Sequence, residues 1–157
     1  MRAFRDRCET AIALREMSPG PDPRHLFVYG TLMRASRSPY AQLLRARAQF
    51  VGEAWTPGRL YLLGRYPGAV FGDDCAGRVY GELFLLRGGT LLAALDAYER
   101  CSGQGEKPDP FYRDVVEVQR AQGERLRAWV YPFAGTVRGR PLIASGRFLV
   151  RSAGAPQ

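Results

Sequence analysis

The sequence HLFVYGTLM, residues 25–33, joins a strand-like run to an unusual turn. Its first residues are apolar and strand-forming, and the run stops abruptly at Tyr29-Gly30-Thr31-Leu32. A surface turn is normally filled with Asn, Asp, Ser or Pro, whereas this turn keeps the apolar residues Leu32 and Met33. The pattern predicts a strand over 25–29 that leads into a turn packed inside the molecule.

Length and composition place the chain among globular proteins. Its 157 residues suit one domain with a proper core, and 46% hydrophobic and 24% charged residues are ordinary proportions. No apolar run approaches the roughly 18 residues of a membrane helix. Residues 1–17 are charged throughout and lack the apolar stretch of a secretory signal. We therefore expect a cytoplasmic protein with no membrane partner.

The cysteine and histidine content argues against metal and disulfide chemistry. The three cysteines, Cys8, Cys75 and Cys101, are widely separated and form no C-x-x-C motif. His25 is the one histidine, so a histidine-based metal centre is not expected. We expect no metal and no cofactor.

The net charge of +8 raises the question of nucleic acid. The arginines are spread along the chain rather than gathered in a run, and Lys107 is the one lysine. An acidic small substrate or a generally basic surface explains this charge as well as a polyanion does. We expect no nucleic-acid partner, and the sequence does not predict the oligomeric state.

Proline and glycine divide the chain into three parts. Residues 1–24 read as a leader, with a possible helix over 4–17, and a proline-rich linker that we expect to be mobile. Residues 25–150 form the domain, and 151–157 form a tail. In the domain, strand-like patterns cover 25–29, 50–55, 58–64, 77–86, 111–119, 125–133 and 147–151, with helices from Ser38-Pro39 onward and over 90–101.

The order of these elements predicts the fold class. Ser38 is a suitable N-cap with Pro39 at the first helical position, and a turn is expected at 121–123 between the last two long strands. Regular alternation of strands and helices is missing, which argues against a doubly wound sheet. We expect an α+β protein, a small mixed β-barrel flanked by two to three helices.

The helix over 90–101 carries a carboxylate on its apolar side. At about 100° per residue, Glu99 falls between Leu92 and Leu95, and Asp96 lies at the edge of that face. Desolvation raises the pKa of such a carboxyl group, which suits a general acid or base. Alternatively, Glu99 turns into water or pairs with an arginine. Asp96 suits a cap or a hydrogen-bond anchor.

Other catalytic schemes have weaker support. Glu82 shares a strand face with Tyr80 and Phe84 and is a second candidate, although ion-paired edge carboxylates are common. A thiol or hydroxyl nucleophile needs a base, and His25, expected to be solvated, is the one imidazole. Nothing marks Cys101 as activated. No G-x-S-x-G, P-loop or G-x-G-x-x-G motif occurs.

Several motifs, taken in order, resemble the gamma-glutamylcyclotransferase-like (AIG2-like) family. They are FVYGTL, YPGAV, GRVYGELF, LDAYE, FYR, AWVY and PLIASGRF, and they run from His25 to Phe148. VYGTL and LDAYE together form a fairly specific pair. The leader is not part of the pattern.

The resemblance implies a mixed barrel with a pocket between the Tyr29-Leu32 turn and Glu99. It implies an enzyme that cleaves a γ-glutamyl amide without a metal: the substrate's α-amine attacks its own γ-carbonyl and releases 5-oxoproline and an amine. Glu99 would be the catalytic acid and base. Tyr29, Gly30, Thr31, Leu32 and Tyr112 would bind substrate, whereas Arg113 is expected to pair with a neighbouring acid.

The opening turn gains a role in this scheme. Gly30 would let the backbone turn sharply and approach a ligand, and the N–H groups of Gly30, Thr31 and Leu32 would form a nest for a carboxylate or an oxyanion. The alternatives are a turn packed for stability and, for the whole protein, a non-catalytic binding or interaction module on the same fold. The amine that the substrate carries stays open.

Overall fold

The computed structural model describes residues 22–72, 76–88, 90–101 and 111–149, without the side chains of 98–101. The possible helix over 4–17, most of the leader and the tail 151–157 lie outside the described residues. The elements are β1 (His25–Val28), α2 (Pro39–Arg47), β2 (Ala48–Leu62), β3 (Pro67–Phe71), β4 (Arg78–Leu86), α3 (Thr90–Cys101), β5 (Asp114–Arg120) and β6 (Arg125–Val130).

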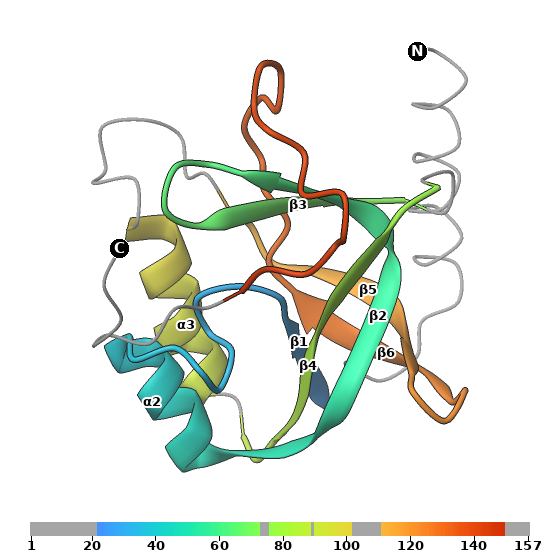
Figure 1. Cartoon of the computed structure of the whole chain (residues 1–157). Helices are drawn as coiled ribbons and strands as arrows, with labels where there is room; N and C mark the ends of the chain where they lie inside the picture. Colours follow the sequence, from blue (N-terminus) through green and yellow to red (C-terminus); the bar gives the residue numbers. More distant parts are fainter. Residues whose placement is uncertain (1–21, 73–75, 89, 102–110, 150–157) are drawn as a thin grey trace.

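The strands form a closed barrel (Figure 1). The sheet order is β3-β2-β4-β1-β6-β5, and an additional pairing of β2 with β5 closes the ring. β1 and β6 run parallel, while the other neighbours are antiparallel. Helices α2 and α3 lie side by side on one side of the barrel (Figure 1). The expected α+β fold, a mixed barrel flanked by helices, is confirmed.

The apolar residues of β1 serve two cores, one on each face of the barrel wall. Phe27 packs inside the barrel, together with Tyr29 just past the strand. Leu26 and Val28 point to the other face and pack beneath the helices. Successive side chains of a strand alternate between faces, so a strand buried on both sides needs an unbroken apolar run. This explains why residues 26–29 are all buried.

The second strand is longer than the sequence pattern indicated. The separate pieces expected over 50–55 and 58–64 are one continuous strand, β2, with a bulge between Phe50 and Gly52. Pro57 does not end it. β2 pairs with β5 before this residue and with β3 after it. The N–H of Gly58 donates to the carbonyl of Gly77, on the side of the strand that faces β4. The position of the missing N–H of Pro57 therefore faces the other side, between the end of the pairing with β5 and the start of the pairing with β3.

The C-terminal segment contains no further strand in its described part. A strand was expected over 147–151, but the described residues 147–149 have no regular structure. The preceding residues instead cross one end of the barrel, where the N–H of Leu62 donates to Pro141 and that of Tyr80 donates to Gly146. Ile143 and Phe148 pack against the interior core. An isolated bridge pairs Leu142 with Tyr61 of β2, and the packing of Ile143 and Phe148 holds the rest of the segment against the barrel.

Within the described residues, no helix has the length and apolar character to span a membrane.

Candidate functional site

The turn after β1 is packed inside the molecule, as its sequence predicted. Tyr29 is 6% exposed and Leu32 is 3% exposed. The N–H of Met33 donates to the carbonyl of Gly30 at 3.0 Å, and the hydroxyl of Ser38 donates to the carbonyl of Thr31 at 3.1 Å. These bonds stabilise the turn through its carbonyl groups.

Gly30 is required by packing rather than by a left-handed backbone. A Cβ atom at this position would lie 2.7 Å from Cγ and 3.0 Å from Cδ of Pro67. Its φ angle is not among the positive ones of the chain. The sharp turn that we expected glycine to permit therefore needs no special backbone conformation. The close approach is made by Pro67, at the start of β3.

A pocket opens beside this turn. Its lining combines the end of β1 and the turn with residues from three later parts of the chain: Phe27, Val28, Tyr29, Gly30, Thr31, Leu32, Tyr66, Pro67, Phe111 and Tyr131. Because β1 and β6 run parallel, their carboxyl ends meet at the same edge of the barrel. This geometry brings the turn after β1 next to Tyr131, directly after β6.

Hydrogen bonds connect the pocket tyrosines to each other and to α3. The hydroxyl of Tyr29 donates to the carbonyl of Tyr131 at 2.6 Å and accepts the N–H of Ala69 at 3.2 Å. The hydroxyl of Tyr131 donates to Oδ1 of Asp96 at 2.6 Å. Tyr131 is the last residue of the AWVY motif, and sequence reasoning gave it no role. The AWVY motif was the one signal in the sequence that could have identified Tyr131 as a site residue.

Asp96 and Arg113 lie together as expected. Nε of Arg113 is 3.0 Å from Oδ1 of Asp96, so the neighbouring acid of Arg113 is identified. With the Tyr131 hydroxyl on the same carboxylate, Asp96 is the hydrogen-bond anchor that its place on the helix indicated. Both predictions are confirmed.

The side chain of Glu99, the expected catalytic group, lies outside the described residues. Its backbone belongs to α3, the helix predicted over 90–101. Leu91 and Leu95 of that helix are buried in the core that also contains Leu32 and Tyr131. The helix is thus packed against residues of the pocket wall.

Tyr112, an expected substrate-binding residue, is 47% exposed. Its N–H donates to the carbonyl of Pro132 at 3.3 Å. The neighbouring Phe111 is 5% exposed and lines the pocket. Phe111, Tyr66 and Phe133 form an aromatic cluster with ring centroids 5.5 to 6.1 Å apart. Sequence reasoning missed Phe111 and Tyr66 as pocket residues, although the FYR and YPGAV motifs contain them.

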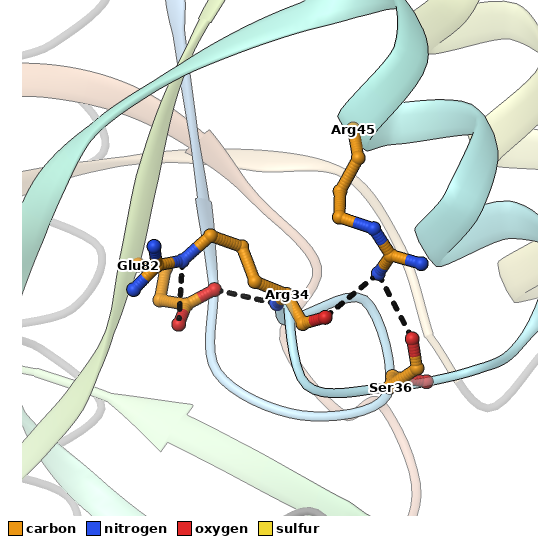
Figure 2. Close-up of polar contacts among 4 residues, drawn as sticks. All are labelled: Arg34, Ser36, Arg45 and Glu82. Carbon is orange, nitrogen blue, oxygen red and sulfur yellow. Dashed lines mark hydrogen bonds and ion pairs between the residues drawn. The ribbon is translucent and has the colours of Figure 1, made fainter.

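Glu82, the second carboxylate candidate, holds the loop that follows the turn (Figure 2). Its Oε1 accepts the N–H of Arg34 at 2.7 Å, and its Oε2 lies 3.4 Å from Nε of the same residue. Nη1 of Arg45, on α2, donates to the carbonyls of Arg34 and Ser36. Glu82 is not among the described lining residues of the pocket. Its contacts are those of a loop anchor.

Groups suited to metal binding or imidazole chemistry are scarce. No cluster of three His, Cys, Asp or Glu side chains suited to a metal occurs within the described ranges. His25 is partly buried at the start of β1, although we expected it to be solvated. Desolvation lowers the pKa of His25, and the positive charges of Arg120 and Arg24 lower it further.

Known proteins resemble this chain in sequence and in fold. The family model described as Gamma-glutamyl cyclotransferase, AIG2-like matches residues 26–150. The chain is 32% identical over 127 residues to the gamma-glutamylcyclotransferase family protein YtfP of Escherichia coli K12, covering 80% of this chain and 96% of that protein. The solution structure of E. coli ytfP aligns with a TM-score of 0.54.

Two crystal structures are also similar. YkqA from Bacillus subtilis has a TM-score of 0.60 at 26% identity; the match covers 80% of this chain but 39% of YkqA. An aig2-like protein from Mus musculus has a TM-score of 0.57 at 26% identity, covering 71% of this chain and 78% of the mouse chain. The resemblance drawn from the motifs is confirmed, and this chain belongs to the gamma-glutamyl cyclotransferase, AIG2-like family.

Proposed function

We propose that the protein is a cytoplasmic enzyme that converts a γ-glutamyl amide into 5-oxoproline and a free amine. The observation that carries the proposal is the pocket lined by the Tyr29-Leu32 turn and by Tyr131. Helix α3 packs against Leu32 and Tyr131 of this lining. Family membership supports it. The turn and the helix are the two elements that this chemistry uses.

The reaction needs no nucleophile from the protein. The α-amine of the substrate attacks the γ-carbonyl, a new C–N bond closes the five-membered ring, and the original amide C–N bond breaks. The α-ammonium nitrogen loses two protons on its way to the lactam N–H. One of them joins the departing nitrogen, which leaves as the free amine, and the other passes to solvent or protonates that amine. Attack within one molecule is fast when the reacting ends are held together.

Glu99 would transfer that proton. It accepts the proton from the α-ammonium group as a base and returns it to the leaving nitrogen as an acid. Glu99 follows Asp96 by three positions on α3, and residues so spaced are neighbours on a helix surface. The contact of Asp96 with Tyr131 supports a location of Glu99 beside the pocket.

The turn would bind the polar groups of the substrate. The N–H groups of Gly30, Thr31 and Leu32 would face a carboxylate or the oxyanion that develops on the γ-carbonyl. The hydrogen bonds from Met33 to the carbonyl of Gly30 and from Ser38 to the carbonyl of Thr31 hold the turn in this conformation. Tyr112 would reach the polar end of the substrate from the rim.

Mass identification of the product tests the reaction. We expect 5-oxoproline from at least one member of a panel containing γ-glutamyl amino acids, γ-glutamyl-lysine, glutathione and other γ-glutamyl amides. Dialysis against a chelator should leave the rate within a few-fold. Free glutamate, or loss of activity with the chelator, would instead indicate a metal-assisted hydrolase. No product from any amide would favour a non-catalytic binding module.

Glu99→Gln tests the proton transfer. An amide cannot transfer the proton, so we expect turnover to fall by roughly 10² to 10⁴-fold while the melting temperature stays near that of the natural protein. Initial rates of 5-oxoproline release measure the effect. Near-normal turnover would move the role to Asp96 or Glu82.

A further inference from the structure

A polar cluster beside the pocket joins three elements that are distant in sequence. Asp96 lies on α3, Arg113 directly precedes β5, and Tyr131 directly follows β6. Oδ1 of Asp96 receives the Tyr131 hydroxyl at 2.6 Å, and Nε of Arg113 lies 3.0 Å from Oδ1 and 3.2 Å from Oδ2. Hydrogen bonds to an ionised carboxylate are about twice as strong as neutral ones. The cluster therefore fixes its members firmly.

Arg113 is itself held in place. Its guanidinium carbon lies 4.3 Å from the ring centroid of Trp129, which is two residues before Tyr131. The side chain is 32% exposed and that of Asp96 is 22% exposed, so solvent screens this pair only in part. Arg113 therefore holds the carboxylate of Asp96 at both of its oxygens.

Tyr131 is fixed at both ends. Its phenol is bound to Asp96, and its carbonyl accepts the hydroxyl of Tyr29. The residue is 4% exposed and lines the pocket, as does Tyr29. A continuous series of hydrogen bonds therefore runs from α3 through Tyr131 to the turn after β1.

We infer that Asp96 is a positioning residue that orients the Tyr131 ring as a wall of the substrate pocket. The inference rests on the proposed cyclisation. A γ-glutamyl chain closes its ring only when its two methylene groups are folded, and aromatic walls favour the folded form by packing against them. The lining offers Tyr66, Phe111 and Tyr131 for this contact. Misplacement of such a wall lowers kcat because reacting atoms must approach within about 3 to 3.5 Å.

Three variants test the hydrogen bond. Asp96→Leu removes the acceptor and also the ion pair with Arg113, Tyr131→Phe removes the donor and keeps the ring, and the double variant removes both. We expect each single change to lower kcat about ten-fold or more with a smaller change in KM, by analogy with the roughly 10²-fold cost of a 1 Å misplacement. Because both act through one bond, the double variant should lose no more than the worse single variant.

Conservative and distant changes complete the test. Asp96→Asn keeps an acceptor for Tyr131 and should retain more of kcat than Asp96→Leu. Glu117→Gln alters an exposed carboxylate of β5 that pairs with Arg125, and kcat should not change. Thermal melts identify any variant that fails to fold, and Tyr131→Phe remains informative if Asp96→Leu does so.

The outcomes separate this inference from the proposed function. Normal kcat in both Asp96→Leu and Tyr131→Phe, with an active natural protein, would overturn the inference alone. Additive losses in the double variant would also overturn it, since the two residues would then act separately. If the natural protein releases no 5-oxoproline from any amide, both proposals fail.

Discussion

At position 30, a single methyl group would collide with the ring of Pro67. We expect Gly30→Ala to lower the free energy of unfolding by about 1 to 3 kcal/mol, because overpacking of a close contact forces the backbone to shift. Gly30 and Pro67 both line the pocket, so we expect this shift to deform the pocket as well. Urea denaturation and the rate of 5-oxoproline release measure the two effects.

Pro67→Ala provides the matched control for this collision. The double variant Gly30→Ala/Pro67→Ala lacks the Cγ and Cδ atoms that the new methyl group would meet. It should be more stable than expected from the sum of the two single changes. Strict additivity would show that the cost at Gly30 has another origin.

We expect the change from Glu to Gln to affect the rate differently at positions 82 and 99. Glu82→Gln keeps an oxygen that can accept the backbone N–H of Arg34, and loses the charge and the second oxygen, which pair with Nε of Arg34. We expect stability to fall by up to about 1 kcal/mol and the rate to stay within a few-fold. Unfolding curves and initial rates check this. A loss of turnover as large as that expected for Glu99→Gln would make Glu82 the acid and base.

Among elements, helix α2 is coupled to the site turn through one hydroxyl group. Ser38 Oγ accepts the N–H of Ala41 as the N-cap and donates to the carbonyl of Thr31, each at 3.1 Å. We expect Ser38→Ala to cost about 1 kcal/mol of stability, as loss of a cap does, and to raise KM by loosening the turn. Urea denaturation and steady-state kinetics measure the two losses.

Ser38→Asp separates the two bonds of this residue. An ionised carboxylate caps a helix well but cannot donate to a carbonyl. Stability should therefore be preserved while KM still rises. A KM equal to that of the natural protein would show that the bond to Thr31 does not shape the pocket.

Local sequence patterns predicted where helices occur better than they predicted whether neighbouring strand segments form one strand. The apolar periodicity of α3 and the Ser38-Pro39 start of α2 depend on neighbouring residues, and both helices occur where expected. β2 was divided at Pro57 because nothing local shows that a strand changes partners there. The expected strand at 147–151 failed in its described part because the segment packs across the barrel end instead.

The candidate site was predictable on one side only. The turn was identified because its residues are adjacent, with apolar side chains where polar ones are usual. The opposite wall joins Tyr66, Phe111 and Tyr131, which are brought together by barrel closure and not by spacing. Phe111 was not identified because the position of a residue in a motif does not tell whether its side chain points inward.

For the whole molecule, the described domain makes a defined contact with the end of the leader. The carbonyl of Arg24 accepts the N–H of Leu86 at 2.8 Å, and the family match begins at residue 26. We expect removal of residues 1–23 to leave 5-oxoproline release and melting temperature nearly unchanged, because this bond is retained. Removal of residues 1–24 is the matched control, since it also deletes the Arg24 carbonyl. A folded but inactive 24–157 fragment would show that the leader shapes the site.

The parallel pairing of β1 with β6 also sets when the pocket can exist during synthesis. The hydroxyl of Tyr29 reaches the carbonyl of a residue 102 positions later in the chain. A ribosome therefore releases the turn long before it has made the strand that completes the wall. Contacts of such long range form late and slowly, because a large loop must close first. The complete pocket is thus a property of the finished barrel, because a nascent chain that ends before β6 lacks the wall that Tyr131 supplies.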